Sequence, residues 1–344
     1  MRSAFFRIAL AVLAFSIVAL AADPEYKVLK TYKLGGEGGW DYLTVDPDSR
    51  SVFISRGTHV MVVNADNGSP VGDIPNTDGV HGIALAPEFG KGFISDGRAG
   101  AVTIFDLKSL KATGTAKAGE NPDAIIYDPA SKRVFAFNGR SHDATAIDAA
   151  SGNLAGTVQL DGKPEFAQSD GAGKVYVNIE DKSEIQAIDS KALKVLASWS
   201  LAPCEEPSGL AIDRDGHKLF AGCGNKMMAV VDTNSGKVIA TPAIGQGVDA
   251  NGYDKDRHLA FSSNGDGTLT IVKQDGRDKY TVLQNVQTAP RARTMALDPK
   301  THNVYLVTAQ FEPPPAGATG EGGRPPRPRM VPDTFELIVV GTGK

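Results

Sequence analysis

The sequence predicts an all-β protein, a seven-bladed β-propeller whose blades are four-stranded antiparallel sheets. Three observations predict it. A unit of about 42 residues repeats seven times along the chain. A complete unit contains four short apolar strands separated by polar turns. The last unit lacks its outer strand, which the N-terminal region supplies. A repeat of this period is typical of propellers, in which ring closure leaves only short sheet edges.

Each repeat begins with an apolar strand that ends in aspartate or an equivalent residue. These anchors are Asp46, Ala86, Asp128, Asp170, Asp213, Asp254 and Asp298. A polar turn follows, then a second strand such as 134–137, another turn, and a third strand such as 228–231. The outer strand completes the unit.

The two ends of the sequence indicate how the ring closes. The last repeat supplies strands at 294–297, 303–308 and 335–340, and no fourth. Residues 28–34 resemble the outer strand 195–201 of another repeat. We therefore expect the N-terminal strand to complete blade seven. An open solenoid is the alternative, and it would need polar caps at both ends.

The first 21 residues have the features of a signal peptide. Arg2 and Arg7 precede an apolar run over 8–20, and 19–21 offers small residues for cleavage. We expect residues 1–21 to be removed and 22–344 to form one propeller domain, periplasmic or secreted and monomeric. A retained membrane anchor is the alternative, but the run is shorter than a spanning helix needs, and no later segment could span a membrane as a helix.

The charge of the chain and its two cysteines exclude some functions and suggest a disulfide. The chain has 36 Lys and Arg against 40 Asp and Glu, so nucleic acid is not expected as a partner, because binding it requires clustered positive charge. The only cysteines, Cys204 and Cys223, are expected to form a disulfide in an oxidising compartment. A soft-metal site is the alternative.

Reading the repeats in register identifies the candidate site. The residues five positions before the anchors, here called the ring positions, are Asp41, His81, Asp123, Glu165, Ser208, Asp249 and Arg293. They should meet around one end of the central channel. His81 should lie between Asp41 and Asp123, and Arg293 between Asp249 and Asp41. Asp123 and Glu165 are adjacent carboxylates without an intervening cation, which raises one pKa unless a ligand lies between them. The alternative is that the ring positions are structural or solvated residues that bind no ligand.

Other residues should border the same face. Trp40 and Phe166 flank the ring positions and could form a pocket wall for a sugar or planar ligand, or pack between blades. The turns after the second strands carry Asn138 and Arg140 as candidate ligand contacts.

Asp-Gly and Asn-Gly pairs end at Gly97, Gly139 and Gly265 in these turns, and they predict positive φ at the glycines. A Pro- and Arg-rich insertion over 311–333 could fold over the channel mouth, bind a partner or be mobile. His217, His258 and His302 are expected to be solvated turn residues on the opposite face.

The repeats resemble those of the YVTN-repeat, YncE-like family of exported bacterial propellers. The residues that carry the resemblance are Tyr176-Val177-Asn178-Ile179, and the unit that runs from Asn121-Pro122-Asp123 through Asp128-Pro129 and recurs at 206–213. The resemblance implies a periplasmic or secreted seven-bladed propeller, and it implies no particular activity.

Three functions remain open from the sequence. The first is a non-enzymatic cell-envelope binding or scaffold protein, whose channel-mouth face takes a small ligand, a metal ion or a partner protein. The second is a divalent-cation-dependent lactonase or lyase, in which Asp123, Glu165 and His81 hold Ca²⁺ or Mg²⁺ with help from Asp41 and Asp249, and His81 and Glu165 act in catalysis. The third is an accessory role in a periplasmic redox system. No phosphate loop, nucleophile elbow or haem-attachment motif is present in the sequence.

Overall fold

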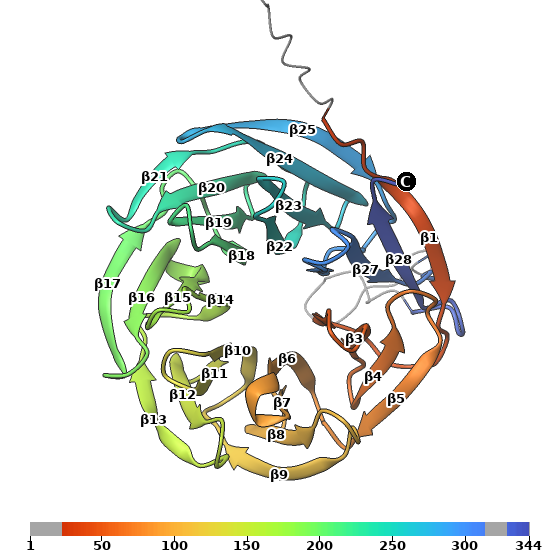
Figure 1. Cartoon of the computed structure of the whole chain (residues 1–344), viewed down its shortest axis with the longest axis vertical. Helices are drawn as coiled ribbons and strands as arrows, with labels where there is room; N and C mark the ends of the chain where they lie inside the picture. Colours follow the sequence, from red (N-terminus) through yellow and green to blue (C-terminus); the bar gives the residue numbers. More distant parts are fainter. Residues whose placement is uncertain (1–22, 314–328, 344) are drawn as a thin grey trace, which may run out of the picture.

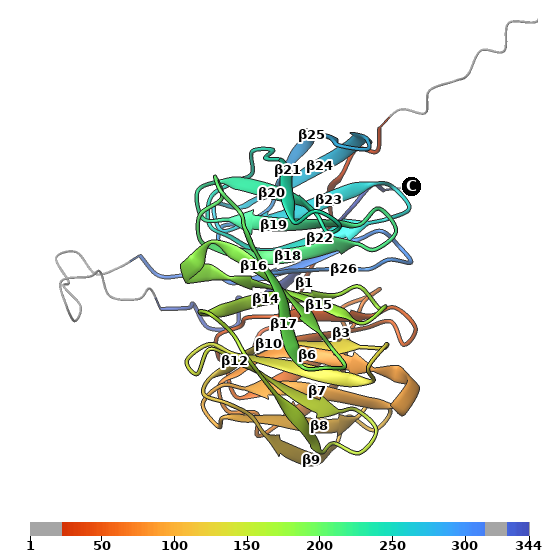
Figure 2. The same cartoon turned by 90° about the vertical axis from the view of Figure 1, so that its left-hand side faces the viewer.

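The computed structural model describes residues 23–313 and 329–343. These residues form seven four-stranded antiparallel sheets arranged in a ring (Figure 1). Turned by 90°, the ring is seen from its edge (Figure 2). The predicted seven-bladed propeller is therefore confirmed. The signal peptide predicted at 1–21 lies outside the described residues.

Every blade has the same order of strands from the channel outwards. The innermost strands are β2 (Leu43–Asp46), β6 (Val80–Ala86), β10 (Pro122–Asp128), β14 (Pro164–Ser169), β18 (Pro207–Asp213), β22 (Val248–Asp254) and β26 (Met295–Leu297). The second strands are β3 (Ser51–Ser55), β7 (Lys91–Asp96), β11 (Arg133–Asn138), β15 (Lys174–Ile179), β19 (Lys218–Cys223), β23 (Leu259–Asn264) and β27 (Val304–Thr308). The third strands are β4 (His59–Asn64), β8 (Ala101–Asp106), β12 (Asp143–Asp148), β16 (Glu184–Asp189), β20 (Met227–Asp232), β24 (Thr268–Gly276) and β28 (Glu336–Gly341). The outer strands are β5 (Pro70–Pro75), β9 (Ala112–Lys117), β13 (Leu154–Gln159), β17 (Lys194–Ser200), β21 (Lys237–Ala240), β25 (Lys279–Gln287) and, from the N-terminal region, β1 (Lys27–Lys33). Single turns of 3₁₀ helix, η1 (Pro87–Phe89) and η2 (Glu180–Lys182), complete the described elements.

The hydrophobic core lies between neighbouring blades. Every residue of β19 and β23 is buried, because a second strand is covered by sheets on both faces, whereas the outer strand β17 alternates between exposed and half-buried side chains. Phe135 and Phe137 of blade three pack with Val175 and Val177 of blade four. Because strand interiors are used for this packing, loops at the channel mouth are left to carry a binding site.

The N-terminal strand closes the ring as predicted, with bounds shifted by one residue. β1 pairs antiparallel with β28 at the outer edge of blade seven, with Val28 opposite Val340 and Tyr32 opposite Leu337. Just before β1, the Tyr26 side chain is buried and its ring meets Phe261 of blade six edge-on at 5.3 Å between centroids. The ends of the ring are thus joined by backbone pairing and by side-chain packing.

Two further predictions have structural outcomes. Cys204, in the loop before β18, and Cys223, at the end of β19, form the predicted disulfide with a Cα–Cα distance of 5.5 Å. The prediction for His302 was wrong, because its Nδ1 lies 2.7 Å from Oδ2 of the buried Asp254, so this histidine is half-buried and hydrogen-bonded. No helix among residues 23–313 and 329–343 has the length and apolar character needed to span a membrane.

Candidate functional site

Six of the seven ring positions line one cavity at the mouth of the channel. This channel-mouth cavity has a volume of about 360 Å³ and is strongly acidic. The ring positions that line it are Asp41, Asp123, Glu165, Ser208, Asp249 and Arg293, and the other lining residues are Tyr42, Lys163, Phe166, Glu180, Glu206, Gly224 and Val248. The repeat register therefore brings together the residues that we expected to meet.

Irregular strand pairing turns these side chains toward the axis. In blades two to six the register of the innermost strand shifts at its first residues, for example between Pro122 and Ile125 of β10. A bulge of this kind bends the strand and re-aims a side chain. The carbonyl of Asp123 is fixed from the preceding blade by the hydroxyl of Ser95, which donates to it at 2.5 Å. The carbonyl of Ser208 accepts a 2.8 Å hydrogen bond from the Asn178 amide in the same way.

His81 lies between two aspartates, as expected. Its Nδ1 is 2.6 Å from Oδ2 of Asp41 and 3.6 Å from Oδ1 of Asp123. Burial lowers the pKa of His81, but the hydrogen bond with Asp41 and the negative charges of Asp123, Asp41 and Glu165 outweigh it, so the net pKa is raised. Burial also raises the pKa of Asp123, opposed by the positive charge of His81 and reinforced by Asp41.

The imidazole of His81 fits against a glycine of the next turn. A Cβ at Gly97 would lie 2.7 Å from Nε2 of His81, which is closer than real contacts allow. The prediction of positive φ at Gly97, Gly139 and Gly265 was wrong, since none of them has it. Their N–H groups donate at 2.9 Å to carbonyls of the loops that precede their own blades' innermost strands, and at Gly97 the contact with His81 leaves no room for a side chain.

Asp41, His81 and Asp123 form a group that could hold a metal ion. One donor atom from each residue lies within 4.8 Å of the other two. The donor set comprises two carboxylate oxygens and one imidazole nitrogen. Glu165, which the sequence placed in the metal site with His81 and Asp123, is not part of this group.

Glu165 is paired with a cation that the sequence interpretation missed. The Lys163 ammonium lies 2.7 Å from Oε1 of Glu165 and also contacts the carboxylate of Glu180. Burial raises the pKa of Glu165, as does the charge of Asp123, against the lowering effect of Lys163. Glu165 thus has a cationic partner from outside the ring positions, which the comparison of adjacent ring positions did not include.

Asp249 and Arg293 form a looser pair on the opposite side of the cavity. Nε of Arg293 is 3.7 Å from Oδ2 of Asp249, too far for a hydrogen bond. Burial raises the pKa of Asp249 to about 7, against the lowering effect of Arg293, while Asp41 and Asp123 raise it further. This side of the cavity thus carries a carboxylate that is poorly stabilised when charged.

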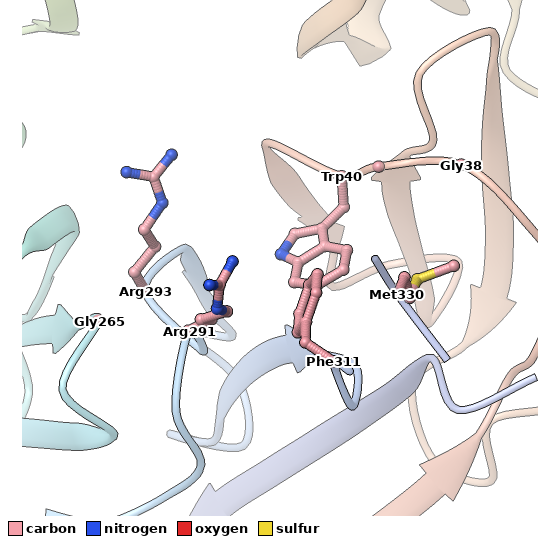
Figure 3. Close-up of a pocket in the computed structure, with 8 residues that line it drawn as sticks. Gly38, Trp40, Gly265, Arg291, Arg293, Phe311 and Met330 are labelled. Carbon is pink, nitrogen blue, oxygen red and sulfur yellow. The ribbon is translucent and has the colours of Figure 1, made fainter. Parts of the chain in front are cut away.

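The aromatic residues divide between two pockets. Phe166 stacks on Tyr42 with ring centroids 4.5 Å apart, and both line the channel-mouth cavity. Burial and the surrounding carboxylates, Asp123 foremost, raise the pKa of Tyr42 well above its usual value, so its phenol stays protonated. Trp40 instead lines a neighbouring pocket of about 770 Å³, shown in Figure 3, which shares Arg293 with the cavity.

Asn138 and Arg140 do not line either pocket. Asn138 is fully buried, and its amide donates to Asp143 at 2.5 Å and to Thr145 at 2.9 Å, which ties the turn to β12. Arg140 is exposed. Of the insertion predicted over 311–333, residues 314–328 lie outside the described residues, while Phe311 and Met330 form an antiparallel bridge at its base.

Comparing a second set of equivalent positions in the repeats would have revealed the missed residues. The positions two residues before the ring positions are Gly39, Gly79, Asn121, Lys163, Glu206, Gly247 and Arg291. Most are residues that tolerate positive φ, so the three with long charged side chains stand out. Lys163 and Glu206 line the channel-mouth cavity and Arg291 lines the neighbouring pocket.

Comparison with known proteins supports the fold alone. No family model matches the chain, and no curated protein matches it in sequence. Solved structures do match, although their sequences are distant. Hydrazine synthase of Kuenenia stuttgartiensis matches with a TM-score of 0.68 at 15% identity, over 85% of this chain and 95% of that chain. The WD40 repeats of RRP9 match with a TM-score of 0.74 at 10% identity, over 93% and 99%. U3-55K matches with a TM-score of 0.72 at 10% identity, over 92% and 99%.

The class is thus defined by architecture. The chain is a seven-bladed β-propeller of four-stranded antiparallel blades. Structural similarity at such low sequence identity does not indicate a function, so a ligand can be inferred only from the residues at the channel mouth.

Proposed function

We propose that this chain is an exported propeller of the YVTN-repeat kind that binds a divalent cation at its channel mouth. The observation that carries the proposal is the convergence of Asp41, His81 and Asp123 from three successive blades, with one donor atom of each within 4.8 Å of the others. The basic n-region and the apolar run of residues 1–21 support export.

The electrostatics of the cavity favour a bound cation. Asp41, Asp123, Glu165 and Asp249 share about 360 Å³, and Lys163 and Arg293 are the only basic residues that line it within the described part of the chain. Burial raises the pKa of three of these carboxyls, Asp123, Glu165 and Asp249, so each is costly to ionise. A divalent ion at His81 would replace the proton that Nδ1 shares with Asp41, and it would stabilise both aspartates in their charged form. Binding would therefore release a proton, and affinity should rise with pH.

The donor set suggests the kind of ion. Carboxylate oxygens are the ligands that Ca²⁺ and Mg²⁺ prefer, and they also suit Mn²⁺. The single imidazole extends the range to Zn²⁺ and other transition metals. The other functions predicted from the sequence are not part of this proposal. They are hydrolase or lyase chemistry at the ion, binding of a small ligand or a protein partner, and an accessory role in a redox system.

Thermal melts of the mature protein test the proposal. The protein is treated with chelator and then titrated with Mg²⁺, Ca²⁺, Mn²⁺, Zn²⁺ and Cu²⁺. An ion at 100 times its dissociation constant adds about 2.7 kcal/mol, which raises the midpoint by roughly 4 °C in a protein of this length. We expect Asp123→Asn to abolish the shift and Glu165→Gln to retain it, since Glu165 is paired with Lys163 and is not part of the group.

The chain provides a matched control on its opposite face. Asp254, Asp256 and His302 form a second group of potential ligands, and Asp256 is exposed. Asp256→Asn should leave the stabilisation unchanged. Loss of the shift in Asp256→Asn and its persistence in Asp123→Asn would contradict the proposal, as would the absence of a shift with every ion.

A further inference from the structure

Beside the acidic cavity lies a larger pocket of opposite character. This aromatic–arginine pocket has a volume of about 770 Å³, which is within the range of small-molecule sites. Its lining residues are Gly38, Gly39, Trp40, Gly265, Arg291, Arg293, Phe311 and Met330. Figure 3 shows the two arginines beside Trp40 and Phe311, with Met330 beyond them.

One wall of the pocket is a preformed apolar surface. The ring of Trp40 lies 5.9 Å from that of Phe311 and 5.3 Å from that of Phe335, centroid to centroid. Trp40, Phe311 and Met330 are half-buried and pack against the core between blades seven and one. The base of the insertion is pinned by the Phe311–Met330 bridge and by the N–H of Glu312, which donates to the Arg329 carbonyl at 2.9 Å. The wall therefore needs no rearrangement to accept a flat apolar ligand.

The same aromatic array lies between two guanidinium groups. The buried Arg56 stacks on Phe335, with Cζ 3.6 Å from the ring centroid, and Arg291 stacks on Phe311 at 4.2 Å. Arg291 is exposed and has no carboxylate within ion-pair distance among the described residues. Arg293, with a side chain 55% exposed, is 3.7 Å from Asp249. The N–H groups of Arg291 are thus available to an anion.

The backbone at Arg291 has the conformation that most blades share at this position. Arg291 has φ of 66°, in the left-handed region. The equivalent residues in blades two, three, five and six are Gly79, Asn121, Glu206 and Gly247, with φ of 70°, 56°, 49° and 71°. Glycine adopts this conformation at the lowest cost, so the backbone does not require a side chain here and Arg291 can be replaced by glycine.

We infer that the aromatic–arginine pocket binds a small aromatic carboxylate, with its ring against Trp40 and Phe311 and its carboxylate on Arg291 and Arg293. Guanidinium groups recognise carboxylates through paired, charge-assisted hydrogen bonds, and they stack on planar groups as well. Aromatic side chains supply the complementary flat surface. The inference is independent of the proposed cation site, because it concerns other residues and another ligand.

Calorimetric titration of the full mature protein tests the inference. The probes are 2-naphthoate, its uncharged analogue 2-naphthamide, and cyclohexanecarboxylate, which has the charge without the aromatic ring. We expect 2-naphthoate to bind at least tenfold more tightly than either analogue, since a charged hydrogen bond is worth about a factor of ten or more in affinity. Chelator is present throughout, so that the result does not depend on the cation site.

The decisive variant is Arg291→Gly. It installs the residue that blades two and six use at this position, so we expect the fold to be kept and the melting temperature to change by no more than about 2 °C. Affinity for 2-naphthoate should fall at least tenfold. The matched control is Arg277→Gln, which removes an exposed arginine from the β24–β25 turn and should leave binding unchanged.

Three results would overturn the inference. The first is no binding of 2-naphthoate by the wild-type protein at millimolar concentration. The second is equal affinity for 2-naphthoate and either analogue, which would mean that the pocket selects only apolar surface or only charge. The third is unchanged 2-naphthoate affinity in a folded Arg291→Gly protein.

Discussion

Replacing Asp249 by asparagine should stabilise the protein at alkaline pH. The carboxylate lies at the start of β22 with 14% of its side chain exposed, and the nearest cationic atom is Nε of Arg293 at 3.7 Å. Burial raises its pKa to about 7, against the effect of Arg293, with Asp41 and Asp123 adding to the rise. Asparagine keeps the shape of the side chain and removes the charge.

The sign and size of the effect follow from proton linkage. Below the pKa of the unfolded chain, near 4, both states are protonated and the carboxyl costs nothing. Between about pH 4 and pH 7 the unfolded chain ionises while the folded protein keeps its proton, so the cost grows with pH. The full shift corresponds to about 4 kcal/mol. We expect about 2 kcal/mol for the substitution, because Arg293 loses its partner in the variant and water reaches part of the site.

Thermal melts in chelator at pH 4, 6 and 8 provide the assay. Asp249→Asn should raise the melting temperature by about 3 °C at pH 8 and leave it unchanged at pH 4. Asp232→Asn serves as a control of opposite sign, because the hydrogen bond with Lys218, 2.7 Å away, lowers the pKa of Asp232 to about 2. That stabilisation is present above about pH 4 and is lost as pH falls through 2, so Asp232→Asn should cost about 1 kcal/mol at pH 8 after solvent screening.

The reasoning about Asp249 is refuted by either of two results. One is a lower melting temperature of Asp249→Asn at pH 8, which would mean that the charged carboxylate is net stabilising. The other is an equal gain at pH 4 and pH 8, which would mean that the effect is packing and not ionisation.

Two further predictions concern packing and covalent structure. Gly97→Ala places a methyl group 2.7 Å from Nε2 of His81 and should lower the free energy of unfolding by about 1–3 kcal/mol, because it displaces the imidazole. Gly114→Ala is the control and should have no such effect, because its Cβ meets nothing within 4 Å. Equal melting temperatures of the two variants would contradict this prediction. Reduction of the disulfide between Cys204 and Cys223, 19 residues apart, should lower the free energy of unfolding by about 3 kcal/mol. Calorimetric melts with and without reductant measure this loss. An unchanged midpoint in a sample whose two thiols are both titrated as free would contradict the prediction.

The fold was predictable because its signal is repeated seven times. Each blade alone offers short apolar strands with ambiguous periodicity, but the recurring anchors from Asp46 to Asp298 fix the register of all of them together. The strand register then places the ring positions at one end of the channel. The same reasoning located β1 in blade seven to within one residue, since an outer strand was missing there.

The contacts within the site were less predictable. Lys163 contacts both Glu165 and Glu180. It lies two residues before the ring position Glu165, so a comparison of the ring positions alone does not include it. Gly97 was attributed to turn conformation because Asp-Gly pairs favour turns, but the close approach of His81 selects glycine as well. The two causes leave the same residue in the sequence, and only the spatial arrangement separates them.

Cation binding at the channel mouth can be tested by an anomalous difference map from a crystal of the mature protein soaked in Mn²⁺. We expect a peak bonded to the donor atoms of Asp41, His81 and Asp123, which lie within 4.8 Å of one another. A peak at Asp254, Asp256 and His302 instead, or no peak at the channel mouth in crystals where Mn²⁺ has free access, would contradict the proposed function.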